Sequence, residues 1–102
     1  MNIDVTKKER TAYLNIDGNI DEQGAEILKQ TISQLNMNDI DKAVIDFKEV
    51  NHIGSAGIGK LLLFYKDFAI KGGQIILDNV SKSLYDLFLV VKLDTLMKIN
   101  IR

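Results

Sequence analysis

The chain of 102 residues contains no cysteine, no proline, no tryptophan and a single histidine, His52. The missing cysteines exclude disulfide bonds and a thiolate nucleophile. With one histidine and no thiolate, the chain also lacks the residues that an ordinary zinc site requires. We therefore expect neither a metal site nor a cofactor.

The chain also lacks an excess of charge of one sign and long apolar runs. Thirteen Lys and Arg residues face fourteen Asp and Glu residues, and aromatic residues make up 7% of the chain. Without a basic block, neither nucleic acid nor an anionic membrane surface is an expected partner. The longest apolar run, residues 61–65, is far shorter than the roughly 20 residues of a membrane span. Because the first residues also lack the apolar core of a signal peptide, a cytoplasmic protein without direct membrane insertion is expected.

Apolar residues are nevertheless abundant enough to build one ordinary domain. The hydrophobic content is 46%, and a chain of this length buries about two thirds of its unfolded surface on folding. No repeat, low-complexity segment or linker interrupts the chain. A single domain over residues 1–102 is therefore expected.

The spacing of apolar residues changes along the first half of the chain. Residues 3–9 and 11–17 alternate apolar and polar positions, which predicts a hairpin. Residues 22–36 carry apolar side chains at helical spacing, and Asp21 is the expected N-cap of that helix. The segment AVIDF, residues 43–47, is almost continuously apolar, which is typical of a strand covered on both faces.

The second half of the chain alternates helices and strands. Ser55 begins a predicted helix, residues 74–78 form another buried strand, Ser81 caps a third helix through residues 84–91, and residues 97–101 alternate again. Such alternation across short loops predicts parallel pairing through right-handed crossovers. The predicted fold is an α/β domain with a mixed sheet of about four to five strands, in which an N-terminal hairpin is followed by parallel β-α-β crossovers, packed with about three to four helices.

The predicted helix after Ser55 has two distinct faces. At about 100° per residue, one face collects residues that should pack on the sheet, namely Ile58, Leu61, Leu62, Tyr65, Phe68 and Ala69. The opposite face carries Ala56, Lys60, Leu63 and Asp67. Leu63 is the one large apolar residue of that face. A single exposed leucine is ordinary, but its place downstream of a glycine-rich stretch equally fits a partner contact.

The stretch GSAGIGK, residues 54–60, reads like most of a nucleotide-binding P-loop. A P-loop continues with Ser or Thr, whose hydroxyl ligates magnesium, but this chain has Leu61 there. Asp78, at the end of the next predicted strand, is a candidate for a magnesium-binding carboxylate. A chain of this length has little room for the water-positioning group and lid of a phosphoryl-transfer domain. Direct nucleotide binding is therefore the weaker interpretation.

Ser55 has two further interpretations within that stretch. A nucleophilic serine needs a histidine base and an acid that orients the histidine. No acid is evidently placed to orient His52, so we do not expect hydrolase chemistry. In a purely structural role, the serine would cap the free amides of the helix while the glycines permit a tight entry from strand to helix.

Three segments resemble STAS domains of the bacterial anti-sigma factor antagonist type. The central one is KAVIDFKEVNHIGSAGIGKLLLFYK, residues 42–66, in which a strand leads through a short linker to a Ser- and Gly-rich helix start. LNIDGNIDEQGAEIL, residues 14–28, is similar to the family's strand, glycine turn and acidic start of the first helix. IILDNVSKSLYDLFLVVKLDTLMKI, residues 75–99, is similar to its last strand, Asn-Val-Ser turn and closing helix. The resemblance covers nearly the whole chain.

The resemblance implies a switch and not an enzyme. Unmodified members of the family bind a partner serine protein kinase that doubles as an anti-sigma factor, so that a sigma factor is released. Phosphorylation of a serine breaks the complex, and a phosphoserine phosphatase restores it. The phosphorylated serine corresponds to Ser55, and the family usually has Asp or Ser before it, where this chain has Gly54.

The resemblance also implies a partner-binding surface around the serine. The expected contact residues are Asp21, Gly54, Ser55, Ala56, Gly57, Lys60 and Leu63. Two alternatives stay open beside the switch. One is a STAS scaffold, or an accessory subunit of a lipid transporter, that is never phosphorylated, and the other is a small nucleotide-binding protein. The oligomeric state is also open, a weak homodimer included.

Overall fold

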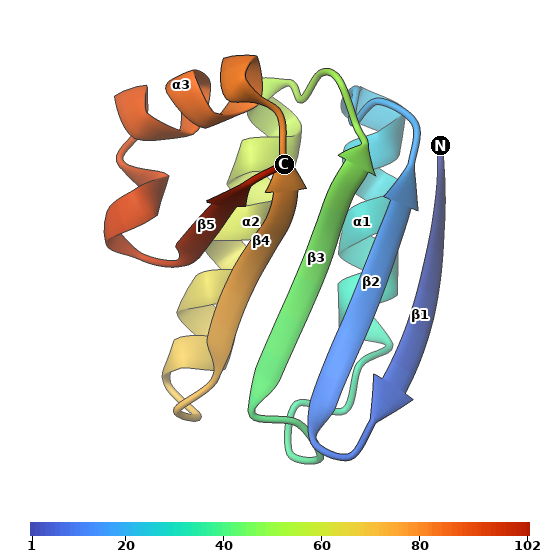
Figure 1. Ribbon diagram of the computed structural model, residues 1–102. Coiled ribbons are helices and arrows are strands. Elements are labelled where there is room, and N and C mark those ends of the chain that lie inside the picture. Colours follow the sequence, from blue (N-terminus) through green and yellow to red (C-terminus); the bar gives the residue numbers. More distant parts are fainter.

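The computed structural model describes residues 1–102 and contains one five-stranded sheet packed with helices (Figure 1). The strands are β1 (Asn2–Lys8), β2 (Thr11–Asp17), β3 (Lys42–Glu49), β4 (Gln74–Val80) and β5 (Lys98–Ile101). The helices are α1 (Glu22–Ser33), α2 (Ser55–Ala69) and α3 (Lys82–Val90), and a 3-10 turn, η1 (Leu93–Thr95), precedes β5. None of these helices has both the length and the apolar character needed to cross a membrane. The predicted α/β architecture is confirmed.

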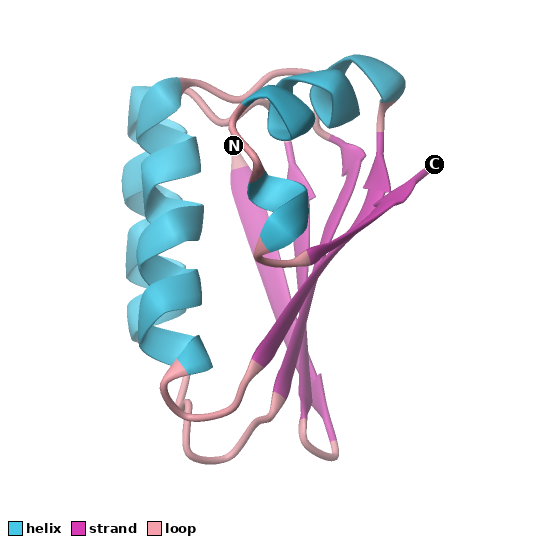
Figure 2. Ribbon diagram, turned by 90° about the vertical axis from the view of Figure 1, so that its left-hand side faces the viewer, coloured by secondary structure: helices cyan, strands magenta, loops and turns pink.

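The direction of the crossovers explains where the helices lie. The strand order is β1-β2-β3-β4-β5, with β1 antiparallel to β2 and every later pair parallel. Each parallel crossover therefore steps in the same direction across the sheet. Because such crossovers are right-handed, α1 and α2 lie on the same face, as Figure 2 shows. The opposite face of the sheet carries no helix.

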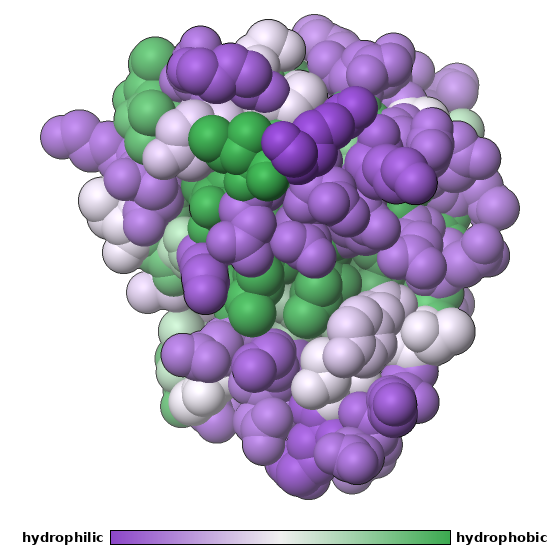
Figure 3. Space-filling model, in the orientation of Figure 1, coloured by the Kyte–Doolittle hydropathy of each residue, from purple (hydrophilic) through white to green (hydrophobic).

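The expectation that residues 43–47 form a strand covered on both faces is wrong. Burial alternates along β3, and the buried side chains are those of Ala43, Ile45 and Phe47. Val44 and Asp46 point to the open face and are only half-buried. Figure 3 looks onto this face and shows an apolar band across its middle. The apolar run in the sequence arises because Val44 belongs to that band.

The core lies between the sheet and the helices, and it is entirely apolar. It contains 23 buried hydrophobic residues and no buried polar residue. Phe47 of β3 and Phe88 of α3 meet edge to face with ring centroids 5.8 Å apart. Phe64 and Phe68 of α2 stack at 5.4 Å. These aromatic pairs join α3 to the sheet and fill the space under α2.

The orientation of α2 differs in part from the prediction. Leu61 and Phe68 are buried as expected, and the other predicted core positions that are at least half-buried are Ile58, Tyr65 and Ala69. Leu62, predicted for the same face, is 38% exposed, whereas Phe64 is buried. The buried face is rotated toward Phe64 because α2 packs against α1 as well as against the sheet.

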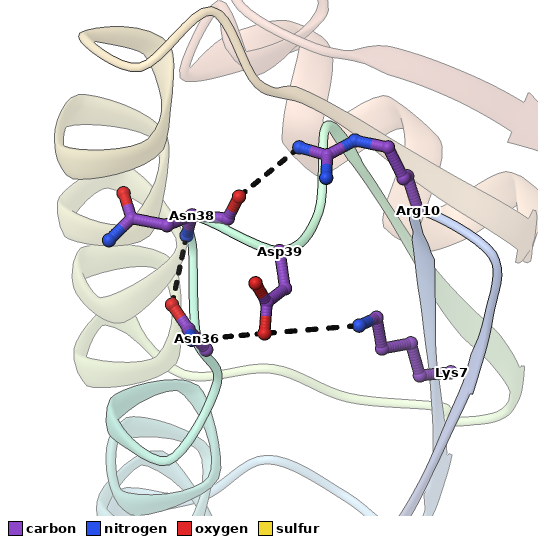
Figure 4. A network of polar contacts seen from close by, with 5 residues as sticks. All are labelled: Lys7, Arg10, Asn36, Asn38 and Asp39. Atoms are coloured by element: carbon purple, nitrogen blue, oxygen red, sulfur yellow. Dashed lines mark hydrogen bonds and ion pairs between the residues drawn. The ribbon is translucent and has the colours of Figure 1, made fainter.

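A polar turn follows α1 and ends that helix earlier than predicted. The Asn36 side chain donates to Asp39 Oδ2 at 3.0 Å and accepts from the Asn38 amide at 3.1 Å. Arg10 donates to the Asn38 carbonyl oxygen at 3.2 Å, and Lys7 lies 4.0 Å from Asp39 (Figure 4). The network ties the hairpin of β1 and β2 to the loop before β3. Because its members are exposed, each contact contributes little to stability.

Alanine substitution at two neighbouring residues of β3 tests the one-sided burial of the sheet. Ile45→Ala removes a side chain that is 0% exposed and should lower the free energy of unfolding by about 2 to 5 kcal/mol. Val44→Ala acts on the open face and should lower it by about 1 kcal/mol or less. Urea denaturation followed by circular dichroism measures both values. Equal losses at the two positions would show that both faces of β3 are covered.

Candidate functional site

The glycine-rich stretch lies where two loops meet, one leading from β2 to α1 and the other from β3 to α2. The backbone amide of Ile20 donates to the His52 carbonyl oxygen at 2.9 Å, and the Gly54 amide donates to the Ile20 carbonyl oxygen at 2.9 Å. Ile20 and Ile53 pair as an isolated parallel bridge. The two loops therefore continue the pairing of β2 and β3 beyond the sheet, up to the starts of α1 and α2.

The side chain of Asn19 holds the second loop in place. Its Oδ1 accepts hydrogen bonds from the backbone amides of Asn51 and His52, both at 3.1 Å. Sequence reasoning missed this role, although an asparagine after a glycine turn often bonds to nearby backbone. His52 takes part in the loop through its backbone, while its exposed imidazole forms no hydrogen bond with Ser55 or with an acid.

Gly57 allows the first turn of α2 to approach these loops closely. Ile20 and Ile53 are buried beneath it, with 0% and 2% of their surface exposed. A Cβ atom at position 57 would lie 2.7 Å from Ile20 Cγ2 and 2.7 Å from Ile53 Cγ1, too close for a real contact. At Gly59, by contrast, a Cβ atom would have no neighbour within 4 Å. Packing therefore demands a glycine at position 57 but not at 59.

Ser55 does not cap α2, so its interpretation as a cap is wrong. The N-cap is Gly54, whose backbone is extended at φ -87° and ψ 173° and which offers no side-chain hydrogen bond. Ser55 is the first residue of the helix, as predicted, and it is exposed. Its hydroxyl forms no hydrogen bond within the chain. The oxygen is thus open to another molecule.

The other two helices have the side-chain caps that α2 lacks. Asp21 Oδ1 accepts from the Gly24 amide at 2.7 Å, which confirms Asp21 as the N-cap of α1. Ser81 Oγ accepts from the Leu84 amide at 3.3 Å at the start of α3, also as predicted. The first amides of α2 have no side-chain partner. The positive end of the helix dipole therefore has no capping side chain, and the exposed Ser55 hydroxyl lies beside it.

The predicted contact residues fall into two groups. The first lies at the joined helix starts and contains Asp21, Gly54, Ser55, Ala56 and, buried among them, Gly57. Lys60 and Leu63 lie further along α2, on the side that faces α1. Lys60 Nζ is 3.9 Å from Glu26 Oε1 of α1. Leu63 is 51% exposed and lines an apolar groove of about 230 Å³ between the two helices.

The geometry does not support the P-loop interpretation of residues 54–60. Residues 55–60 form the first turns of α2, so the amides of Gly59 and Lys60 donate along the helix axis instead of surrounding a phosphate. Asp78 lies on the open face of the sheet, where its Oδ1 accepts from the Asn100 side chain at 3.3 Å. The residues that would form a magnesium nucleotide site are therefore on opposite sides of the molecule.

Comparisons with known proteins show what the chain is similar to. A family model described as STAS domain matches residues 2–101. The anti-sigma-B factor antagonist of Bacillus subtilis (strain 168) is 29% identical over 100 residues, which cover 98% of this chain and 91% of that protein. An anti-sigma factor antagonist from Mycobacterium paratuberculosis matches with a TM-score of 0.84 at 20% identity, over 97% of this chain and 84% of that chain. The Bacillus cell fate determinant SpoIIAA in its phosphorylated form matches with a TM-score of 0.76 at 19% identity, over 96% and 90%.

Alanine at two glycines of α2 should change stability in opposite directions. Gly57→Ala forces a methyl group against Ile20 and Ile53 and should lower the free energy of unfolding by about 1 to 3 kcal/mol. Gly59→Ala places the methyl group in open space and should raise it by about 0.4 to 1 kcal/mol, because alanine favours the helix. Urea denaturation of the two variants side by side measures the difference. If Gly57→Ala proves as stable as Gly59→Ala, α2 does not rest closely on the loops.

Proposed function

The chain belongs to the STAS domain family, and on that premise we propose that it is an anti-sigma factor antagonist controlled by phosphorylation of Ser55. Unphosphorylated, it binds an anti-sigma factor and so frees a sigma factor, and phosphorylated, it no longer binds. The name of the Bacillus subtilis relative supports this class of partner. The observation that carries the regulated step is the exposed Ser55 hydroxyl, which has no hydrogen bond at the uncapped start of α2.

A phosphate on Ser55 is compatible with the fold. It adds about -1.5 to -2 charges at neutral pH and three strong hydrogen-bond acceptors. The uncapped amides of the first turn and the helix dipole favour negative charge at this position. Because the hydroxyl is exposed, no packed side chain has to move. We therefore expect phosphorylation to leave the stability of the domain nearly unchanged.

The same phosphate is incompatible with a close protein interface. Gly54 and Ala56 flank Ser55 with almost no side chain, so a partner can approach the backbone of the helix start directly. A partner that fits this surface has no room for a phosphate, which would also have to lose its water. A loss of about 1.4 kcal/mol already weakens binding tenfold. A modification that leaves the domain intact can therefore break the complex.

The proposed interface extends beyond Ser55 in two directions. Asp21 joins it because the hydrogen bond between Gly54 and Ile20 places the start of α1 beside the start of α2. Along α2, Leu63 lines an apolar groove that can receive a partner side chain. Lys60 adds a charge at the edge of that groove, where it is only loosely paired with α1.

In this proposal the switch needs a sigma factor and two enzymes, a kinase and a phosphatase. All three proteins are cytoplasmic. A serine protein kinase transfers the γ-phosphoryl group of ATP to Ser55 Oγ, ADP leaves, and the kinase accepts the hydroxyl proton. Following the family, we assign this kinase activity to the anti-sigma factor itself. A phosphoserine phosphatase then hydrolyses the ester, and water supplies the oxygen of the released phosphate and the proton of the restored hydroxyl.

Ser55→Asp places a fixed negative charge at the start of α2. We expect its affinity for the anti-sigma factor, measured by isothermal titration calorimetry, to fall at least about tenfold, while the free energy of unfolding changes by less than about 0.5 kcal/mol. Ser83→Asp is the matched control, because Ser83 is an exposed serine in the first turn of α3 and lies outside the proposed interface. It should bind like the unmodified chain. Normal binding by Ser55→Asp would count against Ser55 as the switch.

Phosphorylation itself is tested with the cognate kinase and ATP. Intact-mass spectrometry should show a single added phosphoryl group on the wild-type chain and none on Ser55→Ala. Ser55→Ala should still bind the anti-sigma factor, because the hydroxyl forms no hydrogen bond that the fold needs. A wild-type chain whose mass stays the same would favour a STAS scaffold without phosphoregulation.

A further inference from the structure

The face of the sheet without helices has an ordered pattern of side chains. Paired residues of neighbouring strands point to the same face, so they form rows across the sheet. One row is apolar at its centre, where Tyr13 pairs with Val44 and Val44 pairs with Ile76. Tyr13 is 38% exposed and the other two are half-buried. Figure 3 shows the resulting apolar band with hydrophilic residues above and below it.

Carboxylates lie on one side of the apolar band. Asp4 of β1, Asp46 of β3 and Asp78 of β4 belong to one row, which Asn15 of β2 completes. The hydrogen bonds that Asp46 and Asp78 accept come from neutral N–H groups. Their negative charges are therefore not neutralised within the chain.

Two lysines lie on the other side of the band and a third lies within it. Lys8 of β1 and Lys42 of β3 occupy the next row, whereas Lys98 of β5 belongs to the apolar row itself, at its end. None of these lysines and none of the three carboxylates forms an ion pair within the chain. Apart from Lys48, which follows Asp46 on the same face, and Lys98 in the apolar row, the face carries negative charge, then an apolar band, then positive charge along the strands.

We propose that this face binds a second copy of the chain in a symmetric dimer whose two-fold axis runs along the apolar band. A half-turn about that axis places each strand over the same strand of the other copy, in the opposite direction. Asp4 then meets Lys8 of the second copy, and Asp46 meets its Lys42. The apolar side chains of the band meet their own copies at the axis, and so does Lys98 on the exposed edge strand β5, where water and salt screen the two like charges.

The charge pattern favours this two-fold axis over the other axis that would bring the same face of two copies together. A symmetric contact requires a patch that is complementary to itself. A two-fold axis along the strands would place carboxylates over carboxylates and lysines over lysines, which is repulsive. The axis along the apolar band instead places each negative row over a positive row. Because the pattern is complementary to itself in this way, we assign a second copy as the occupant.

The size of the face indicates a weak dimer. Five strands about 4.8 Å apart and rows that span about 20 Å along the strands give about 500 Å² per copy. A total of about 1,000 Å² lies at the lower end of specific interfaces. Sheets packed face to face lie about 10 Å apart, a distance that their side chains fill. We expect dimerisation at micromolar concentrations, and weaker dimerisation at high salt, which screens the charge pairs.

The dimer leaves the surface around Ser55 free. That surface lies past the end of β3, at the start of a helix on the covered side of the sheet. Because the strands of the two copies run in opposite directions, the two Ser55 hydroxyls lie at opposite ends of the dimer. Dimerisation and binding of an anti-sigma factor can therefore occur together. The dimer is tested in the absence of the anti-sigma factor, so its failure and the failure of the proposed switch are distinguishable.

Sedimentation equilibrium of the full chain between about 10 and about 500 µM tests the dimer. The weight-average mass should rise from that of one chain toward that of two, and less steeply in about 0.5 M salt. Ile76→Lys places two like charges near the axis and should raise the dissociation constant at least about tenfold. Ile70→Lys makes the same change at a residue that is 80% exposed at the end of α2, and it should dimerise normally.

Should Ile76→Lys fail to fold, Tyr13→Lys replaces it as the variant with like charges near the axis. Charge reversal provides a second test. Asp4→Lys and Lys8→Glu should each weaken the dimer, and the double variant should restore it because both new pairs again have opposite charges. A wild-type chain that stays monomeric at the highest concentration overturns the proposal. A dimer that persists in both Ile76→Lys and Tyr13→Lys also overturns it. Such a dimer would form through another surface, such as the free edge of β1.

Discussion

The close approach of α2 to two joined loops is the constraint on which the candidate site depends. Ile20 and Ile53 extend the pairing of β2 and β3 beyond the sheet and form a buried floor. Gly57 allows the helix to rest on that floor, and Gly54 enters the helix without a side chain to cap it. The side chain of Ser55 makes few contacts of its own. Its position therefore follows from the packing of Gly57 on Ile20 and Ile53. The result is a helix start whose first amides have no side-chain partner.

The order of the strands separates the molecule into surfaces with different roles. Because every crossover steps the same way, the helices cover one face and the loops that begin them gather at one end of the sheet. The proposed switch occupies that end, where a phosphate changes a surface without disturbing the core. The open face carries charges and a half-buried apolar band. If both proposals hold, a partner at the end and a second copy on the face do not compete, so regulation and assembly can be combined.

The order and type of the elements could be predicted because each depends on the spacing of neighbouring residues. The cap by Asp21 and the helix start at Ser55 also depend on local chemistry, and both predictions were correct. The wrong predictions have a different cause, which is contact between residues that are distant in the sequence. The interpretation of Ser55 as a cap follows the preference for serine at that position, but the hydrogen bond from Gly54 to the distant Ile20 places Gly54 at the N-cap instead. The exposed side chain of Leu62 likewise reflects the packing of α2 against α1.

Neighbouring residues along the chain were enough to predict which segments become strands and helices, which residues begin the helices, and which chemistries the composition excludes. Which distant residues share a surface depends on the tertiary structure. Gly57 meets Ile20 on the covered side, and Asp4 joins the row of Asp46 on the open side. These neighbours depend on strand order, register and the handedness of the crossovers. Those properties arise from the packing of the whole chain, so the spacing of residues within one segment does not predict them.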